Sequence, residues 1–281
     1  PSDNNSFKSG QCVGNIQTIR NKTAELAGVF GTLICDEVHR CPAKTFTDTL
    51  NAIRARHKIG LSGTLKRKDE MHIVLPDYFG STVFVGRVEN TIAPTVHLWQ
   101  SEIALNANEF VPWANKITEL VNNMDYRKSI LGLANSYAES GHKVLVLCDR
   151  TELLEWGHLE TEDYSLMITG KINDTTQRQL ILDEMNDLNS DAAILWGTQS
   201  IFSEGVSVNA LSCVILGTPL NNEPLLEQIC GRVMRQLEGK QMPVVCDIAL
   251  SGNTGKRHAY ARKGFYINKG WKLVSMGDPN T

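Results

Sequence analysis

Two adjacent carboxylates follow an apolar run early in the chain, in the stretch LICDEVHRC (residues 33–41). Asp36 and Glu37 come directly after TLIC, a run typical of a buried strand. At the carboxyl end of a parallel strand, one carboxylate can hold hydrated Mg²⁺ while its neighbour orients and deprotonates a water molecule. His39 could contact a neighbouring strand end. The stretch predicts the metal and water side of an ATPase site; the plainer alternative is a surface turn with ordinary acids.

A second stretch places hydroxyl groups at the same predicted sheet edge. Ser62 and Thr64 follow the next apolar run, KIGLS, in the sequence GLSGTLKR. Because parallel strands end at one edge of a sheet, these hydroxyls could bond to His39 or to the carboxylates. The alternative is a plain strand-to-helix turn, in which Ser-Gly-Thr is common.

A predicted helix, NEPLLEQICGRVMRQ, carries two arginines and a glutamine. Gln228, Arg232 and Arg235 are spaced i, i+4 and i+7, so the helical period places them on one face, and Asn222 is a suitable N-cap. Guanidinium groups bind polyphosphates well. The alternative is a salt-bridged helix surface, but a glycine inside a helix costs about 1 kcal/mol relative to alanine. Close approach of a backbone or a ligand would explain Gly231.

A polar loop and a basic tail could contact nucleic acid. The loop TQSIFSEGVSV joins two apolar strands and includes Thr198 and Gly205, whose hydroxyl and backbone groups could reach a sugar-phosphate chain or a ribose. The tail alternates cations with aromatic rings: Lys256, Arg257, Arg262, Lys263, Lys269 and Lys272 with Tyr260, Phe265, Tyr266 and Trp271. Cations can track phosphates while rings stack on bases. The alternative is a C-terminal helix docked on the sheet, and both hold if the rings face inward and the cations outward.

Short apolar runs alternate with segments of helical period, which predicts an α/β fold with parallel sheets. We divide the chain near residue 100. Residues 1–100 carry about three core strands, among them TVFVG (residues 82–86), too few for a complete doubly wound domain. Residues 101–281 carry about five, which is enough.

Composition is that of a globular protein, with 42% hydrophobic and 21% charged residues among 281. No apolar stretch approaches the roughly 20 residues that span a bilayer, so we expect no membrane partner. Seven cysteines, mostly inside apolar runs, favour free thiols in a reducing cytoplasm. Net charge is −3, with acidic residues concentrated between basic ends; a solvated surface is the favoured interpretation.

Seven stretches in a fixed order carry a family resemblance: GNIQTIRN, CDEVH, GLSGTLKR, VLVLCDRTELL, ITGKINDTTQRQLI, TQSIFSEGVSV and QICGRVMRQ. Together they resemble superfamily 2 DNA helicases of the DExH type, in particular the phage UvsW and XPB-like group. The resemblance implies two RecA-like domains that bind ATP and Mg²⁺ between them and step along single-stranded or branched DNA in repair or recombination. The resemblance implies a cytoplasmic location, which is the cytoplasm of the host cell if the chain is phage-encoded.

The resemblance also implies a role for each matching residue. Asp36 would hold Mg²⁺ and Glu37 would be the catalytic base. The γ-phosphate would be contacted by Gln228, Arg232 and Arg235, and hydrolysis would be coupled to movement through His39, Ser62 and Thr64. The nucleic acid would be contacted by Gln17, Thr18, Thr198 and Gly205, and by Lys256, Arg257, Arg262 and Lys263 in the tail. Ser207 departs from the family pattern, where an acidic residue is common.

The family's phosphate-binding loop, GxxxxGK[ST], has no match in these 281 residues. This predicts a first RecA-like domain truncated at its N-terminus, and a chain that by itself hydrolyses ATP poorly or not at all, because the loop supplies the main ligands of the phosphates. Two alternatives stay open. The chain could be a non-catalytic nucleic-acid-binding module, or the motor part of a restriction enzyme.

Overall fold

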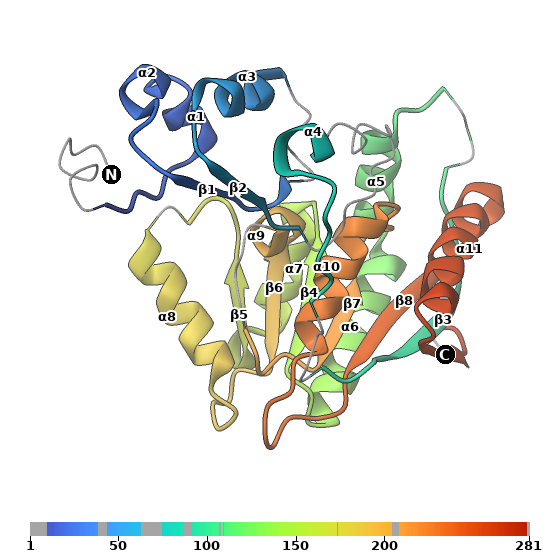
Figure 1. Ribbon diagram of the computed structural model, residues 1–281. Helices are drawn as coiled ribbons and strands as arrows, with labels where there is room; N and C mark the ends of the chain where they lie inside the picture. Colours follow the sequence, from blue (N-terminus) through green and yellow to red (C-terminus); the bar gives the residue numbers. More distant parts are fainter. Residues whose placement is uncertain are drawn as a thin grey trace. The chain divides into compact units, whose positions relative to one another are not determined.

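The computed structural model describes residues 10–38, 44–62, 75–86, 91–106, 108, 110–172, 174–203 and 208–279. Its contacts divide the chain into two compact units, Pro1–Arg87 and Val88–Thr281, shown in Figure 1. The predicted division near residue 100 falls inside strand β3 (Thr95–Ala104), which pairs with strands of the second unit. The structural division therefore lies earlier than the predicted one.

The first unit contains a two-stranded parallel sheet. Strands β1 (Thr32–Cys35) and β2 (His57–Gly60) pair in register, with Thr32 opposite His57 and Cys35 opposite Gly60. The helices are α1 (Ile16–Ile19), α2 (Thr23–Leu26), α3 (Lys44–Ala52) and α4 (Leu75–Phe79). A small core gathers around Cys35, Val38, Leu50 and Leu75.

The predicted strand at residues 82–86 is wrong. This segment has no regular secondary structure, and Phe84 is 91% exposed, with its neighbours Val83 and Val85 also largely exposed. Valine and phenylalanine favour strands because they pack on a pleated, half-buried surface. Among the described residues no strand pairs with this segment, and these side chains therefore have no sheet to pack on.

The second unit contains a seven-stranded parallel sheet in the order β5-β6-β4-β7-β8-β3-β9. Besides β3, its strands are β4 (Val144–Cys148), β5 (Ser165–Ile168), β6 (Ile194–Thr198), β7 (Cys213–Leu216), β8 (Val244–Ser251) and β9 (Lys272–Met276). The run VLVLC of β4 is buried throughout, as is typical of a central parallel strand.

Helices cover both faces of this sheet (Figure 1). They are α5 (Trp113–Asn122), α6 (Met124–Glu139), α7 (Thr151–Glu160), α8 (Thr175–Asn186), α9 (Gln199–Ser203), α10 (Glu223–Val233) and α11 (Gly252–Asn268). Alternate residues of β4 enter two separate cores: Val146 packs in the cluster with α6 and α7, and Leu145 in the cluster with α10 and α11. This fold is the predicted α/β class with parallel sheets.

Two local features of the structure agree with the residues that form them. Helix α6 ends before Gly141, whose positive φ of 85° suits the left-handed position after a helix. Cysteines 35, 148, 213 and 246 are free and buried, as expected from their apolar runs.

Candidate functional site

The two carboxylates lie directly beyond the end of β1. Leu61 donates its backbone N–H to the Cys35 carbonyl, 2.8 Å, and Val38 donates to the Leu61 carbonyl, 3.0 Å, so the pairing of the two strands continues past Cys35. Asp36 is exposed and Glu37 is half-buried. Parallel pairing thus brings both acids and the half-buried Ser62 to one edge of the sheet, as the sequence predicts.

The backbone at Glu37 is strained. Its φ is +51°, in the left-handed region that non-glycine residues rarely adopt, and its N–H donates to Asp36 Oδ1 at 2.9 Å. The next residue, Val38, is buried against β2, where a Cβ added to Gly60 would lie 2.9 Å from Val38 Cγ1. The close approach of Val38 and Gly60 therefore holds the turn that sets the Glu37 carboxylate. Sequence reasoning missed this role of Gly60.

Relief of this strain is expected when Glu37 is replaced by glycine. A left-handed non-glycine residue costs roughly 1–2 kcal/mol, and glycine's extra freedom in the unfolded chain offsets about 0.5–1 kcal/mol of that. Hydrogen exchange at the amides of Val38 and Leu61, which close the turn, should therefore slow by about two- to fivefold. Asp36→Gly is the control, because its φ is not positive, and it should speed exchange. If both replacements speed hydrogen exchange equally, the backbone at Glu37 is not strained.

Gln17 and Thr18, which are predicted to contact the nucleic acid, lie on the short helix α1 and are both exposed. The Asn15 side chain caps this helix by accepting the Gln17 N–H at 3.1 Å. His39 and Thr64, predicted to couple hydrolysis to movement, lie outside the described residues, and so do Gly205 and Ser207 of the second unit.

In the second unit, Thr198 ends β6 and is buried, and Ser200 donates its hydroxyl to Thr198 Oγ1 at 3.3 Å. Gln199 donates its amide to the Thr218 hydroxyl beyond β7 at 3.0 Å. The predicted polar loop is thus partly helical, because residues 199–203 form α9. Its polar groups gather at the carboxyl ends of β6 and β7.

Helix α10 begins as predicted, with the Asn222 side chain accepting the Leu225 N–H at 3.3 Å. Arg232 is only 5% exposed, and its Nε has no hydrogen-bond partner among the described residues. Burial, and secondarily the charge of Arg235, lower the pKa of Arg232 to about 10, so the group is still cationic at neutral pH. A buried guanidinium with an unpaired donor is unfavourable until an anion reaches it.

Arg235 does not share that helical face, contrary to the prediction. Helix α10 ends at Val233, because Ile92 donates its N–H to the Met234 carbonyl and Arg235 bridges to Thr91. The Arg235 side chain donates to Asn209 Oδ1 at 3.1 Å. The half-buried Gln228 stays on α10 with Arg232.

Lys240 joins this basic group, which sequence reasoning missed. Its Nζ donates to the carbonyls of Asn209 and Arg235, at 3.0 and 2.6 Å. Burial, and then the charge of Arg235, lower the pKa of Lys240 to about 8. Close packing of a neighbouring backbone does not explain the glycine at position 231, because a Cβ added to Gly231 would meet nothing within 4 Å.

The tail forms helix α11, with Phe265, Tyr266 and Trp271 packed inward as one alternative predicted. Arg262 is the exception among the predicted DNA-contacting cations. It is 3% exposed and binds Asp247 of β8 through two nitrogens, with distances of 2.7–3.0 Å. Because this carboxylate neutralises it inside the core, Arg262 is a structural residue, whereas Lys256, Arg257 and Lys263 are exposed.

Within the described part of the chain, no group of three His, Cys, Asp or Glu side chains could hold a metal ion. No described helix is long and apolar enough to cross a membrane.

Two family models match the chain. Residues 2–67 match "Type III restriction enzyme, res subunit", and residues 124–236 match "Helicase conserved C-terminal domain". The first match includes Asp36 and Glu37, and the second includes α10 with Arg232. The two carboxylates therefore lie in sequence of the restriction-enzyme type, and Arg232 lies in sequence of the helicase type.

The chain is similar to the "Probable helicase D10" of Escherichia phage T5, with 45% identity over 94% of this chain and 59% of the relative. It is also similar to the "ATP-dependent DNA helicase uvsW" of Enterobacteria phage T4, with 22% identity over 90% of this chain and 52% of the relative. The chain thus spans a little over half of each.

Solved structures share the fold. The crystal structure of T4 UvsW has a TM-score of 0.54 and 20% identity, covering 98% of this chain and 60% of that one. A fragment of a putative HsdR subunit of a type I restriction enzyme from Vibrio vulnificus has a TM-score of 0.68 and 19% identity, covering 94% and 52%. With the two family models and the phage relatives, these findings show that the chain belongs to the superfamily 2 helicases.

Proposed function

We propose that the protein is an ATP-dependent DNA helicase or translocase that acts on single-stranded or branched DNA in repair or recombination. The observation that carries this proposal is the buried, cationic Arg232, whose Nε lacks a partner among the described residues. A phosphate oxygen of ATP is a suitable acceptor, because guanidinium groups neutralise the charge that develops during phosphoryl transfer. Gln228 and Arg235 would assist it.

In the first unit, Asp36 and Glu37 would divide the work on Mg²⁺ and water. Asp36 Oδ1 accepts the Glu37 N–H, which leaves its second oxygen for a water of hydrated Mg²⁺. Mg²⁺ would neutralise the phosphate oxygens of ATP when bound. The Glu37 carboxylate would orient the attacking water and accept its proton.

The remaining predicted roles complete this proposal. Unit 1 would be part of the first RecA-like domain and unit 2 the second. Ser62, with His39 and Thr64, would couple ATP hydrolysis to movement along the DNA. The DNA strand would be contacted by Gln17, Thr18, Thr198 and Gly205. Because these 281 residues contain no GxxxxGK[ST] sequence, we expect slow ATP turnover from them alone.

Remodelling of branched DNA tests the proposed substrate. The complete product of the gene is incubated with a labelled four-way junction, with a linear duplex as the matched control. We expect ATP-dependent conversion of the junction to forked products, faster than separation of the linear duplex. Conversion that is as fast without ATP, or that does not distinguish the two substrates, would contradict the proposal.

The motor part of a restriction enzyme is the second candidate. It is favoured by the match of residues 2–67 to a restriction-enzyme subunit and by the fold shared with HsdR. A parallel incubation with circular duplex DNA separates the two candidates, because a restriction motor in its complete enzyme cleaves this DNA when ATP is present.

A further inference from the structure

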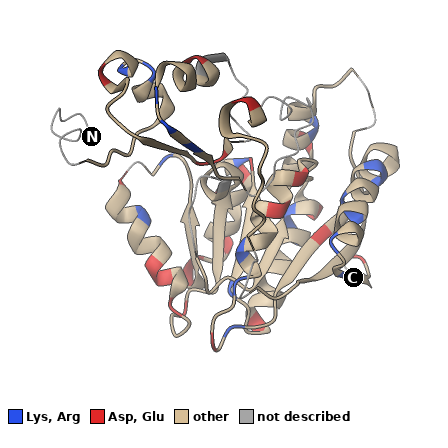
Figure 2. Cartoon of the chain, in the orientation of Figure 1, with Lys and Arg blue, Asp and Glu red and all other residues tan. Residues whose placement is uncertain are grey.

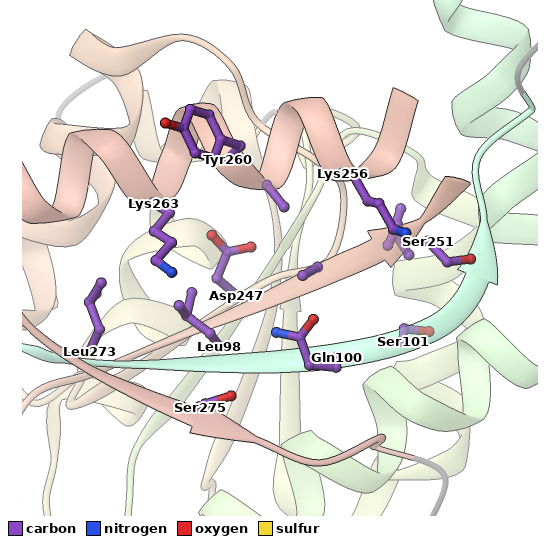
Figure 3. Close-up of a pocket in the computed structure, with 13 residues that line it drawn as sticks. Leu98, Gln100, Ser101, Asp247, Ser251, Lys256, Tyr260, Lys263, Leu273 and Ser275 are labelled. Carbon is purple, nitrogen blue, oxygen red and sulfur yellow. The ribbon is translucent and has the colours of Figure 1, made fainter. Parts of the chain in front are cut away.

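A groove lies between helix α11 and strands β3, β8 and β9 of the second unit (Figure 3). Its volume is about 620 Å³, within the range of ligand-binding sites. The helix contributes Lys256, Tyr260 and Lys263, and the strands contribute Leu98, Gln100 and Ser275. In the sheet order, β4, β7 and β8 separate β3 from β6, so the groove is distinct from the site around Thr198.

The groove carries uncompensated positive charge. Lys256 and Lys263 form no ion pair with a described residue. Asp247 is the acidic residue among those that line the groove, and Arg262 already neutralises it. Helix α11 has four Lys or Arg residues and no Asp or Glu. Figure 2 shows blue along this helix. A ligand with two or more negative charges is therefore the electrostatic complement.

The spacing of the two lysines suits a chain of phosphates. They are seven residues apart on one helical face, about 10 Å along the axis at 1.5 Å per residue. Figure 3 shows both amines turned from the helix toward the strands. Tyr260 lies on the same face between them and is 79% exposed, whereas the other tail aromatics are buried. An exposed ring between two cations can stack on a base.

We propose that this groove binds a single-stranded segment of nucleic acid, an inference that rests on the proposed helicase function. Lys256 and Lys263 pair with two phosphates, and Tyr260 stacks on a base between them. The side-chain amide of Gln100 and the hydroxyl of Ser275 hydrogen-bond to no described residue, and they bond to the sugar or to the edge of a base. The apolar side chain of Leu98 contacts the faces of the sugar and the base.

The test is binding of fluorescent oligodeoxythymidine to the full chain by anisotropy, at several salt concentrations. In the double variant Lys256→Gln, Lys263→Gln, the salt slope should fall by about 1.4, because each phosphate contact on a single strand contributes about 0.7. Affinity at 0.1 M salt should fall about tenfold or more. Tyr260→Ala should weaken binding at least about fivefold with the slope unchanged, because stacking releases no counterions.

The matched control is Lys269→Gln, Lys272→Gln, which removes the same charge from cations outside the groove. If the two double variants change the affinity and the salt slope equally, the groove is not the binding site. So would an acidic peptide, polyglutamate, that binds as tightly as the oligonucleotide and is insensitive to Tyr260→Ala. DNA-stimulated ATP hydrolysis by the unaltered gene product tests the helicase function separately: if stimulation persists while the groove variants bind normally, only the groove inference fails.

Discussion

Replacement of Glu37 by glutamine is expected to abolish DNA-stimulated ATP hydrolysis by the complete gene product. The amide keeps the shape of the side chain but cannot accept the proton of the attacking water. General-base catalysis contributes about 10²- to 10⁴-fold, so turnover should fall by at least about 100-fold. Binding of ATP and DNA should persist, because the phosphates and the strand are held by other residues. The measurement is steady-state ATP hydrolysis with saturating single-stranded DNA.

Glu25→Gln is the matched control for this prediction. Glu25 is an exposed acid on helix α2 of the same unit, so its neutralisation removes the same charge without touching the strained turn. The control should retain the unaltered rate. A Glu37→Gln protein that hydrolyses ATP as fast as the control would show that Glu37 is not the base.

Replacement of Asp247 by asparagine is expected to destabilise the second unit severely. Asp247 is 2% exposed and accepts from Arg262 and, at 2.8 Å, from the Tyr266 hydroxyl. The Asp247 charge raises the pKa of Arg262 despite its burial, so the guanidinium is cationic in the folded protein. Removing one partner of a buried pair leaves an uncompensated charge, which costs about 3–5 kcal/mol.

Urea unfolding followed by circular dichroism measures this loss. Glu227→Gln is the control, because it breaks the exposed pair with Lys269 and should cost at most about 1 kcal/mol. The double replacement Asp247→Leu, Arg262→Met should recover much of the stability, since apolar residues of similar volume replace buried ion pairs well. An Asp247→Asn protein as stable as the Glu227→Gln protein would contradict the structural role.

Features set by local periodicity could be predicted from the sequence. The run TLIC forms β1 over the expected residues, VLVLC forms a fully buried β4, and Asn222 caps α10. In each case the signal lies within a few residues, either as an apolar run or as a capping side chain. The ends of two parallel strands then bring Asp36, Glu37 and Ser62 to one edge without further information.

Features set by distant partners could not be predicted. Arg235 leaves the helical face because Thr91 pairs with its backbone. Arg262 resembles its basic neighbours in sequence, and only the packing of α11 on β8 reveals Asp247 beside it. The short edge strand β9 was missed because its five residues pair with β3, far away in the sequence. The φ of Glu37 depends likewise on Val38 meeting Gly60 across two strands.

We propose that Glu37 and Arg232 are both required for DNA-dependent ATP hydrolysis. The most direct measurement is the rate of ATP hydrolysis by the complete gene product, with and without DNA, for the unaltered protein and for Arg232→Gln. We expect DNA to stimulate the unaltered protein, and the variant to be reduced as severely as Glu37→Gln at both DNA levels. DNA-stimulated hydrolysis that survives Arg232→Gln at the unaltered rate would contradict the claim.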